Sequence, residues 1–217
     1  MTNFATRRRM MVDTQVRPSD VTEFPIIEAM LTIPREAFVP REKIEAAYAS
    51  EHVELWPGRH LLDARLFAKM LEALDLTNQD LVLDVGAGLG YSSAVIARIA
   101  EAVVAVEEDD DQVAEAQALL TEQHSDNVVL HAAKLTEGAS AHGPYDAIII
   151  EGGVETLPNA ITDQLKEGGR IVCIFIENAL GVVKVGHKSD GNIMWRHMFN
   201  GTAPVLQGFE KASEFAL

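Results

Sequence analysis

A glycine-rich segment in the middle of the chain constrains the fold most strongly. Residues 81–85 form a short run that is apolar on both faces and predicts a buried strand. Gly86, Gly88 and Gly90 follow at once, and a helical pattern begins at Tyr91. Glycine permits a tight turn, and backbone N–H groups at a helix N-terminus can face a ligand. The segment therefore predicts a strand, a turn and a helix that together carry a binding loop.

The sequence around this loop alternates short apolar runs with helix-length polar runs. Strands are predicted at 102–106, 127–131, 145–150 and 170–176, and helices at 91–100, 110–123 and 158–166, the last closed by Gly168 and Gly169. Strands that alternate with helices form a parallel sheet. The segments 182–188 and 193–199 flank a Ser-Asp-Gly turn and predict an antiparallel hairpin. The fold class is α/β, a doubly wound and mostly parallel sheet that ends in a C-terminal antiparallel hairpin.

The first third of the chain has a different texture. Helical segments are predicted at 21–31, 42–48 and 63–74, with an extended segment at 52–56. We therefore divide the chain into an N-terminal helical extension with a loop, residues 1–76, and an α/β core, residues 77–217. Residues 1–20 are polar and lack apparent core partners, so we expect them to lie across a second subunit in a homo-oligomer.

Composition narrows the classes of partner. The 18 Lys and Arg residues against 33 Asp and Glu give a net charge of −15, which disfavours nucleic acid. Arg7-Arg8-Arg9 is the exception, and such a triplet is either solvated helix surface or a nucleic-acid contact. No apolar run reaches the roughly 18 residues of a membrane span, and no secretory signal begins the chain, so we expect a cytoplasmic protein. The lone Cys173 is expected in the core, and the histidines lack metal-ligand spacing, so no metal is expected.

Two acids flank the predicted loop. Glu107 ends the next strand, where a carboxylate can accept hydrogen bonds from both ribose hydroxyls of a nucleoside. Asp84 lies beneath the loop and either holds it or approaches the ligand. A dinucleotide fingerprint would need glycine at position 91, where the chain has Tyr91, so a nicotinamide cofactor is disfavoured. The alternative is that the glycines form a tight turn alone and Glu107 is a surface acid.

Three blocks of residues resemble the protein-L-isoaspartate O-methyltransferase family. They are residues 27–40 with Ile33-Pro34-Arg35-Glu36-Ala37-Phe38-Val39-Pro40, the loop at 83–91, and residues 144–170 with Pro144-Tyr145-Asp146 and Gly168-Gly169-Arg170. The resemblance implies a Rossmann-like methyltransferase, S-adenosylmethionine as cofactor, and methyl transfer to isoaspartyl carboxylates in damaged proteins or peptides. The cofactor-binding residues that it and the loop pattern suggest are Asp84, Gly86, Ala87, Gly88, Gly90, Tyr91, Glu107, Leu135 and Glu151.

The chain departs from the family pattern in the loop at residues 58–64. Leu62 stands where the family has a serine, so one hydroxyl near the reacting groups is lost. His60 and Asp63 are candidates to replace it, and Leu62 itself occupies the position of the catalytic serine. The alternative for Asp63 is that it caps the following helix.

Two further departures concern the cofactor and the acceptor. Lys134 stands where the family carries an aspartate for the adenine amino group, so we expect an apolar pocket with Leu135 against the ring. Glu151 replaces a small residue at a strand end, and it either faces an acceptor or caps the next segment. Three hypotheses therefore remain: an isoaspartyl-repair methyltransferase, a diverged methyltransferase with another acceptor, and a non-catalytic nucleoside-binding module.

Overall fold

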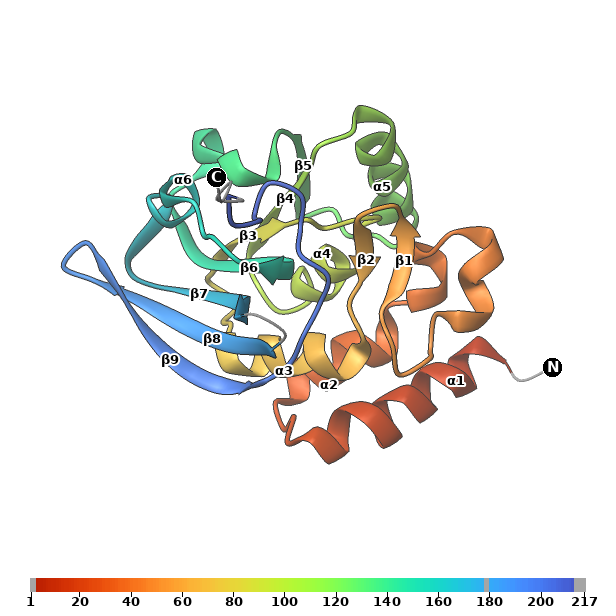
Figure 1. The fold of residues 1–217 in the computed structure, drawn as a ribbon. Coiled ribbons are helices and arrows are strands. Elements are labelled where there is room, and N and C mark those ends of the chain that lie inside the picture. Colours follow the sequence, from red (N-terminus) through yellow and green to blue (C-terminus); the bar gives the residue numbers. More distant parts are fainter. Residues whose placement is uncertain (1–2, 178–179, 213–217) are drawn as a thin grey trace, which may run out of the picture.

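The computed structural model describes residues 3–177 and 180–212, and within these residues the main sheet has seven strands (Figure 1). The strands are β3 (Leu81–Val85), β4 (Ala102–Glu107), β5 (Val128–Ala132), β6 (Tyr145–Val154), β7 (Leu165–Glu177), β8 (Leu180–Ser189) and β9 (Asn192–Asn200). Their order across the sheet is β5-β4-β3-β6-β7-β8-β9. The first five strands in this order run parallel to one another, and β8 and β9 add an antiparallel edge. The predicted fold class is confirmed.

The period of two along each strand divides the apolar side chains between the two faces of the sheet. Alternate residues of β3 and β6, such as Val82 and Ile149, pack with the N-terminal segments and with helices α3 (Ala64–Leu74) and α4 (Tyr91–Ile96). The residues between them, such as Leu83 and Ile150, belong to a second cluster with Tyr145, Ile161 and the tail residue Phe209. Helix α5 (Asp110–Glu122) buries Leu120 in the first cluster. The sheet is therefore covered on both faces, as its apolar strands require.

The N-terminal extension is built from short helices and one hairpin. The helical segments are α1 (Phe4–Met11), a π-helical turn (Val12–Val16), three 3-10 segments (Arg17–Ser19, Arg35–Phe38 and Arg41–Ala46) and α2 (Phe24–Thr32). The strands β1 (Val53–Trp56) and β2 (Arg59–Leu61) pair antiparallel. Figure 1 shows α1, α2 and α3 along one side of the sheet and the β1–β2 hairpin beside the strand ends. The hairpin therefore brings residues 53–61 to the edge where β3 and β4 end.

The prediction that residues 1–20 lie across a second subunit assumed that they lack partners in the core, and this assumption is wrong. Met11, Val12 and Val16 are buried in the first apolar cluster of their own chain. Arg8 forms an ion pair with Glu36 at 3.1 Å and donates to the Tyr48 hydroxyl. Residues 4–19 thus have partners within the chain, and the basic triplet is partly engaged there. The homo-oligomer and the domain division at residue 76 stay predictions.

The predicted helix at 158–166 is too long. Helix α6 spans Asn159–Thr162, and β7 already begins at Leu165, which pairs with Tyr145. Lys166 binds Asp146 at 2.8 Å, and Gly168 takes a φ of +77°, which lets the strand bulge before Arg170 pairs with Ala147. Tertiary pairing therefore overrides the local helical pattern, and the two glycines shape a β-bulge instead of a helix end.

The C-terminal hairpin is confirmed, with Asp190 and Gly191 both at positive φ in its turn. Beyond β9, the segment 203–209, here called the C-terminal tail, crosses the end of β6 (Figure 1). Gly153 donates to Pro204 O at 2.8 Å, and Leu206 donates to Gly153 O at 3.0 Å. The tail therefore lies over the strand ends at which ligands bind in open α/β sheets.

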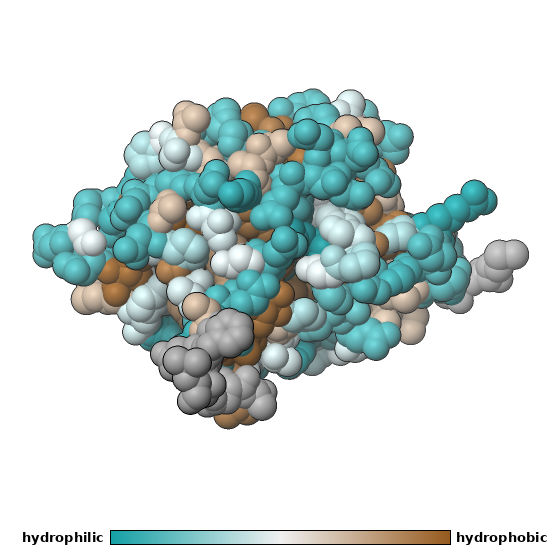
Figure 2. All heavy atoms as spheres, turned by 45° about the horizontal axis from the view of Figure 1, so that its top comes forward, coloured by the Kyte–Doolittle hydropathy of each residue, from teal (hydrophilic) through white to brown (hydrophobic). Residues whose placement is uncertain are grey.

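The outer surface is largely hydrophilic. Hydrophilic side chains cover most of the face drawn in Figure 2, and apolar side chains show in smaller areas among them. Within residues 3–177 and 180–212, no helix is long and apolar enough to cross a membrane.

Candidate functional site

The strand order places the candidate site between β3 and β6. Chain connections leave β3 for β4 on one side, whereas β6 lies on the other, so the order reverses between β3 and β6. In open α/β sheets, ligands bind in the crevice outside the carboxyl ends of the strands at such a reversal. The glycine loop follows β3, Glu107 ends β4, and Glu151 lies near the end of β6. The fold thus brings these sequence-predicted residues to one edge.

The glycine loop is a tight turn held from both sides. Gly86, Gly88 and Gly90 have φ values of +82°, +60° and +95°, a region that residues with a Cβ rarely adopt. Gly86 donates to Val106 O at 3.0 Å. A Cβ on Gly88 would lie 2.6 Å from Leu55 Cδ1. The β1–β2 hairpin therefore packs closely on the loop, and a side chain at position 88 would displace Leu55 in addition to straining the positive φ.

Glu107 fixes this loop and is itself held by an arginine. Its Oε1 accepts a hydrogen bond from the Gly88 N–H at 2.7 Å. Arg59 Nη2 donates to Oε2 at 3.0 Å, and Arg59 Nε lies 2.8 Å from Oε1. Both side chains are almost fully buried. Burial raises the pKa of Glu107, while the Arg59 guanidinium and the Gly88 N–H oppose that shift. The acid is therefore no surface residue but the buried anchor between the loop and the hairpin.

A cavity of about 300 Å³ lies beside this ion pair. Its walls come from the hairpin, the end of β4 and the C-terminal tail: Trp56, Pro57, Gly58, Arg59, Glu107, Glu108, Asp109 and Gln207. An aromatic ring, a carboxylate and polar groups thus surround one concave space next to the glycine loop. This composition suits a nucleoside, which needs an apolar wall for its base and a carboxylate for its hydroxyls.

Asp84 is buried beneath the loop and supports helix α4. Its Oδ2 accepts hydrogen bonds from Ser92 Oγ at 2.7 Å and Ser93 Oγ at 2.6 Å. Burial raises the pKa of Asp84 to about 6, the two hydroxyls oppose the shift, and the Glu107 charge adds to it. Oδ1 is buried and has no hydrogen-bond partner among the described residues. Asp84 therefore holds the loop through one oxygen and keeps the other free.

Tyr91 and Arg35 form the floor of the crevice. The Arg35 guanidinium carbon lies 4.9 Å from the Tyr91 ring centroid, and Phe38 packs edge-on against the same ring. Arg35 is fully buried, donates from Nε to Ala47 O at 2.6 Å and donates from Nη2 to Leu62 O. Its Nη1 and the Tyr91 hydroxyl have no hydrogen-bond partner within the part of the chain that the structure describes. The two groups still interact with each other, since burial raises the pKa of Tyr91 and the Arg35 guanidinium opposes that shift.

Glu151 completes this buried group from the β6 side. Its side chain is buried, and Oε1 has no hydrogen-bond partner among residues 3–177 and 180–212. Burial raises the pKa of Glu151 well above its ordinary value, the Asp84 charge adds to the shift, and Arg35 opposes it. The carboxyl group faces the crevice floor and caps no helix, because α6 has Pro158 at its N-cap.

Leu135 and Lys134 lie at the second wall of the crevice. Leu135 is buried, and its Cδ1 would lie 3.7 Å from a Cβ on Gly86. Its N–H donates to Glu108 Oε1 at 3.0 Å. Lys134 points outward, with 75% of its side chain exposed and Glu137 at 3.9 Å. Leu135 and Leu206 thus bring apolar groups over Gly86, with Arg59 Nη1 beside them at 3.7 Å from the same Cβ position, and the apolar adenine pocket stays a prediction. Ala87 is buried as well.

The loop at residues 58–64 separates its three candidate residues. Leu62 is buried in the apolar core with 1% exposure. Asp63 caps α3, because its carboxylate accepts from Leu66 N–H at 2.9 Å. His60 alternates with Arg59 along β2, so it lies on the opposite face of the hairpin from Glu107, and burial lowers its pKa. A reactive role for these three residues stays a prediction.

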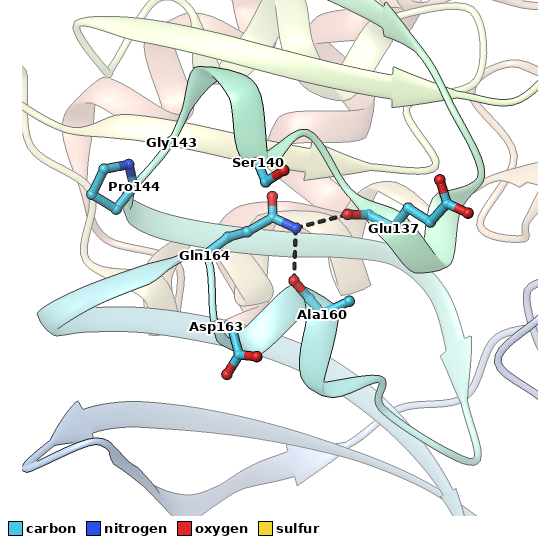
Figure 3. A pocket seen from close by; sticks show the side chains of 7 residues that line it. All are labelled: Glu137, Ser140, Gly143, Pro144, Ala160, Asp163 and Gln164. Carbon is cyan, nitrogen blue, oxygen red and sulfur yellow. Dashed lines mark hydrogen bonds between the residues drawn. The ribbon is translucent and has the colours of Figure 1, made fainter.

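A larger cavity lies elsewhere. It measures about 480 Å³ and is lined by Glu137, Ser140, Gly143, Pro144, Ala160, Asp163 and Gln164 (Figure 3). Gln164 donates to Glu137 O and Ala160 O at 2.7 Å each, and its Oε1 accepts from Ala139 N–H. These bonds satisfy the amide and tie the segments around α6 together. The cavity is therefore a surface hollow around a structural glutamine and is separate from the glycine loop.

Comparison with known proteins decides the family. The family model for "Protein-L-isoaspartate(D-aspartate) O-methyltransferase (PCMT)" matches residues 7–201. The chain belongs to this family. The protein-L-isoaspartate O-methyltransferases of Roseiflexus castenholzii and Pelotomaculum thermopropionicum are each 34% identical to it over 170 residues, which is 78% of this chain and 78% and 74% of theirs. The resemblance stated from the sequence is confirmed.

Solved structures of the same family share the fold. A protein-L-isoaspartate O-methyltransferase superposes with a TM-score of 0.80 at 22% identity, over 95% of this chain and 66% of the other. A putative family member from Plasmodium falciparum, in complex with S-adenosyl-L-homocysteine, gives a TM-score of 0.79 at 18% identity, over 95% and 99% of the two chains. The Rossmann-like methyltransferase architecture is therefore shown for this chain.

Two features of this family member were missed from the sequence. Arg59 lies inside the loop at 58–64 and was passed over, because its partner Glu107 lies 48 positions away along the chain. The C-terminal tail lies beyond the residues that the family model matches. Its Leu206 fills the space over Gly86 and Gly152, and no local pattern in residues 203–209 announces this contact.

Proposed function

We propose that this chain transfers a methyl group from S-adenosylmethionine to the free α-carboxylate of isoaspartyl residues in proteins or peptides. The observation that carries the proposal is the family match over residues 7–201, together with a glycine loop and a carboxylate at the reversal of the strand order. Relatives that are 34% identical carry the name of this activity. The cytoplasmic location expected from the sequence belongs to this proposal.

The residues present fit the cofactor. Glu107 offers a carboxylate for two vicinal hydroxyls, and Trp56 and Leu135 offer apolar surface on two sides. Asp84 Oδ1 offers a buried acceptor for an ammonium group beneath the loop. The bound cofactor supplies an electrophilic methyl group on a sulfonium.

Arg59 must release at least part of Glu107 when a ribose binds. Each carboxylate offers about four acceptor positions, and Arg59 and Gly88 engage both oxygens at present. Removing a buried counter-ion without replacement is costly, so the ribose hydroxyls have to replace the guanidinium donors. We infer that cofactor binding exchanges one set of donors on Glu107 for another.

The reaction needs no base from the chain. A carboxylate acceptor has an ordinary pKa near 4 and is ionised at neutral pH. An oxygen–methyl bond forms as the sulfur–methyl bond breaks, and the electron pair goes to sulfur. The chain has to hold acceptor and donor in line and exclude water. Arg35 contributes to this by tying residue 62 to the crevice floor through the Leu62 carbonyl.

The test is transfer of a labelled methyl group to an isoaspartyl peptide, with the normal aspartyl peptide as control. Selective labelling of the isoaspartyl peptide supports the proposal. Cofactor binding by calorimetry without transfer to either peptide would favour another acceptor, which the apolar Leu62 also permits. Failure to bind S-adenosylmethionine or its demethylated product would contradict the cofactor assignment.

A further inference from the structure

One acidic side chain in the crevice has no structural task. Glu151 is 4% exposed, and its Oε1 is buried without a hydrogen-bond partner among the described residues. It caps no helix and forms no ion pair within residues 3–177 and 180–212. A buried carboxyl group without partners destabilises a fold, and destabilising groups persist at functional sites.

Glu151 lies where an acceptor has to arrive. Ile150 pairs with Val85, so Glu151 follows beside Gly86 at the reversal of the strand order (Figure 1). Side chains alternate along β6, which directs Gly152 toward Leu206 on one face and Glu151 toward the other. That other face carries Asp84 of β3, Arg35 and Tyr91. Strand β2, which leads into Leu62, packs against β6.

The charges around Glu151 favour its neutral form. Asp84 on β3 is the anion that acts on Glu151, Arg35 is the cation that opposes it, and the Tyr91 hydroxyl on α4 is uncharged. Glu107 is neutralised by Arg59. Desolvation raises the pKa of Glu151 well above its ordinary value of 4.5, and Asp84 adds to the rise. The side chain is therefore a carboxylic acid, which can donate a hydrogen bond, at pH values where a surface glutamate only accepts.

The loop at 58–64 lacks the donor that a neutral acid can supply. Leu62 is buried among apolar side chains and offers no hydroxyl. The Leu62 carbonyl is held by Arg35, the same guanidinium whose charge acts on Glu151. Arg35 thus links the two positions, because it donates to the carbonyl of residue 62 and its charge acts on the carboxyl group of residue 151.

We propose that Glu151 binds the methyl acceptor by donating a hydrogen bond from its carboxyl group to the acceptor oxygen that is not methylated, in place of the hydroxyl that Leu62 lacks. This assigns Glu151 as a specificity-determining residue for carboxylate acceptors, and it rests on the function proposed above. The proton stays on Glu151 throughout. One acceptor oxygen bonds to the methyl group, and the sulfur takes the electron pair.

The neutral form is essential to this role. An ionised Glu151 would place a second negative charge beside Asp84 and repel an acceptor carboxylate. A base at this position would serve an acceptor that has to lose a proton, which a carboxylate does not. A glutamine at position 151 keeps a hydrogen-bond donor but cannot accept a proton. Glu151→Gln should therefore stay active if Glu151 is a donor and lose activity if it is a base.

The experiment compares Glu151→Gln and Glu151→Ala with the exposed control Glu101→Gln. We expect Glu151→Ala to raise KM for the isoaspartyl peptide about tenfold to a hundredfold, the worth of one hydrogen bond to a charged group, with cofactor affinity by calorimetry unchanged within about twofold. Glu151→Gln should keep KM near the wild-type value. It should also abolish the fall in activity as the pH rises through the raised pKa of Glu151. Glu101→Gln should match the wild type throughout.

Two readouts do not depend on activity. The infrared carbonyl band of a protonated carboxyl group should be present in the wild type at neutral pH and absent from Glu151→Gln. The glutamine variant should also unfold at a higher temperature than the wild type at alkaline pH, because it removes a buried group that has to ionise. A structural role would predict a lower unfolding temperature.

The outcomes separate this inference from the proposed function. A wild type that binds cofactor but never labels an isoaspartyl peptide contradicts the proposed function, whatever the infrared band shows. A wild type that labels the peptide, with an unchanged KM in Glu151→Ala, overturns the inference alone. Loss of activity in Glu151→Gln equal to that in Glu151→Ala would also overturn it and indicate a proton acceptor instead.

Discussion

Two buried acids stand at the ends of neighbouring strands, and they are treated differently by the fold. Asp84 is the last residue but one of β3, and its carboxylate accepts hydrogen bonds from two seryl hydroxyls of α4. Glu151 lies near the end of β6 and has no hydrogen-bond partner for Oε1 in the described part of the chain. Burial raises the pKa of both, to about 6 for Asp84. One acid is thus built into the binding loop, and the other is left for a ligand.

The difference follows from what comes next along the chain. Helix α4 begins at Tyr91, seven residues after Asp84, so its first turn can return hydroxyl groups to the strand end. After Glu151 the chain runs on as Gly152 and Gly153, which offer no side chains and pack against the tail. Parallel strands repeat the same backbone, but the connection after each strand decides whether a buried acid is satisfied. The described part of the chain therefore supplies no hydrogen-bond partner to Glu151 Oε1.

The largest expected effect comes from removing the two hydroxyl groups that bond to Asp84, which leaves this acid without hydrogen-bond partners, as Glu151 Oε1 is. We predict that Ser92→Ala with Ser93→Ala lowers the free energy of unfolding by about 3–6 kcal/mol at about pH 8, since each hydroxyl donates to a charged group. Asp84 has a raised pKa, so its ionisation costs stability as the pH rises from 3.8 to about 6. Without the hydroxyls the pKa rises further, and the additional loss grows above pH 6. Urea unfolding at several pH values measures it.

A matched control is Thr121→Ala, which removes an exposed hydroxyl that bonds within helix α5. It should change stability by less than about 0.5 kcal/mol at every pH. If the double seryl variant lost as much stability at acid pH as at alkaline pH, Asp84 would not be the group that the hydroxyls serve.

The second prediction sharpens the comparison at Glu107, a third strand-end acid that has a cationic partner. Arg59→Gln should lower the free energy of unfolding by about 3–5 kcal/mol, because one member of a buried ion pair is removed. The pKa of Glu107 is already raised by burial, so the loss should increase as the pH rises. S-adenosylhomocysteine should stabilise the variant more than the wild type, because ribose hydroxyls then satisfy an unpaired carboxylate. Thermal unfolding with and without ligand measures both effects.

The exposed Arg65→Gln serves as control for the loss of charge, and its ligand-induced shift should equal that of the wild type. An equal shift in Arg59→Gln would mean that the ribose does not take over the Arg59 position on Glu107.

The sheet and the loop were predictable because their signals are local. Apolar runs predicted the mostly parallel sheet, glycine spacing predicted the loop, and a turn sequence predicted the C-terminal hairpin. The positions of Glu107 and Glu151 at one edge follow from the geometry of parallel strands. Asp63 showed its capping role in the same way, because a cap is read from the residues beside it.

The rest depended on contacts between distant segments. Arg59 meets Glu107 across 48 positions, and nothing near either residue announces the pair. The pairing of Leu165 with Tyr145 replaced a predicted helical turn by strand. Residues 1–20 looked polar as a group, yet Met11, Val12 and Val16 reach the core. Such choices are settled by burial after collapse, which a single sequence does not display.

The third and smallest prediction tests whether the two faces of β6 are independent. Leu206 is 2% exposed and lies so close to Gly152 that a Cβ there would meet its Cγ at 2.5 Å. Leu206→Ala should lower the free energy of unfolding by roughly 2–3 kcal/mol, the lower part of the range for a buried leucine, because a terminal tail can relax into the space. The half-buried Val205→Ala should lose less.

Glu151 points to the opposite face from Gly152. The cavity that Leu206→Ala creates should therefore admit no water to the surroundings of Glu151. The pH at which activity falls on the alkaline side should therefore be the same in Leu206→Ala as in the wild type, even though the protein unfolds more easily. A shift of that limb toward lower pH would mean that water entering beside the tail reaches Glu151, because hydration lowers the pKa of a buried acid. The tail would then be part of what keeps Glu151 neutral, and the two faces of β6 would form one site.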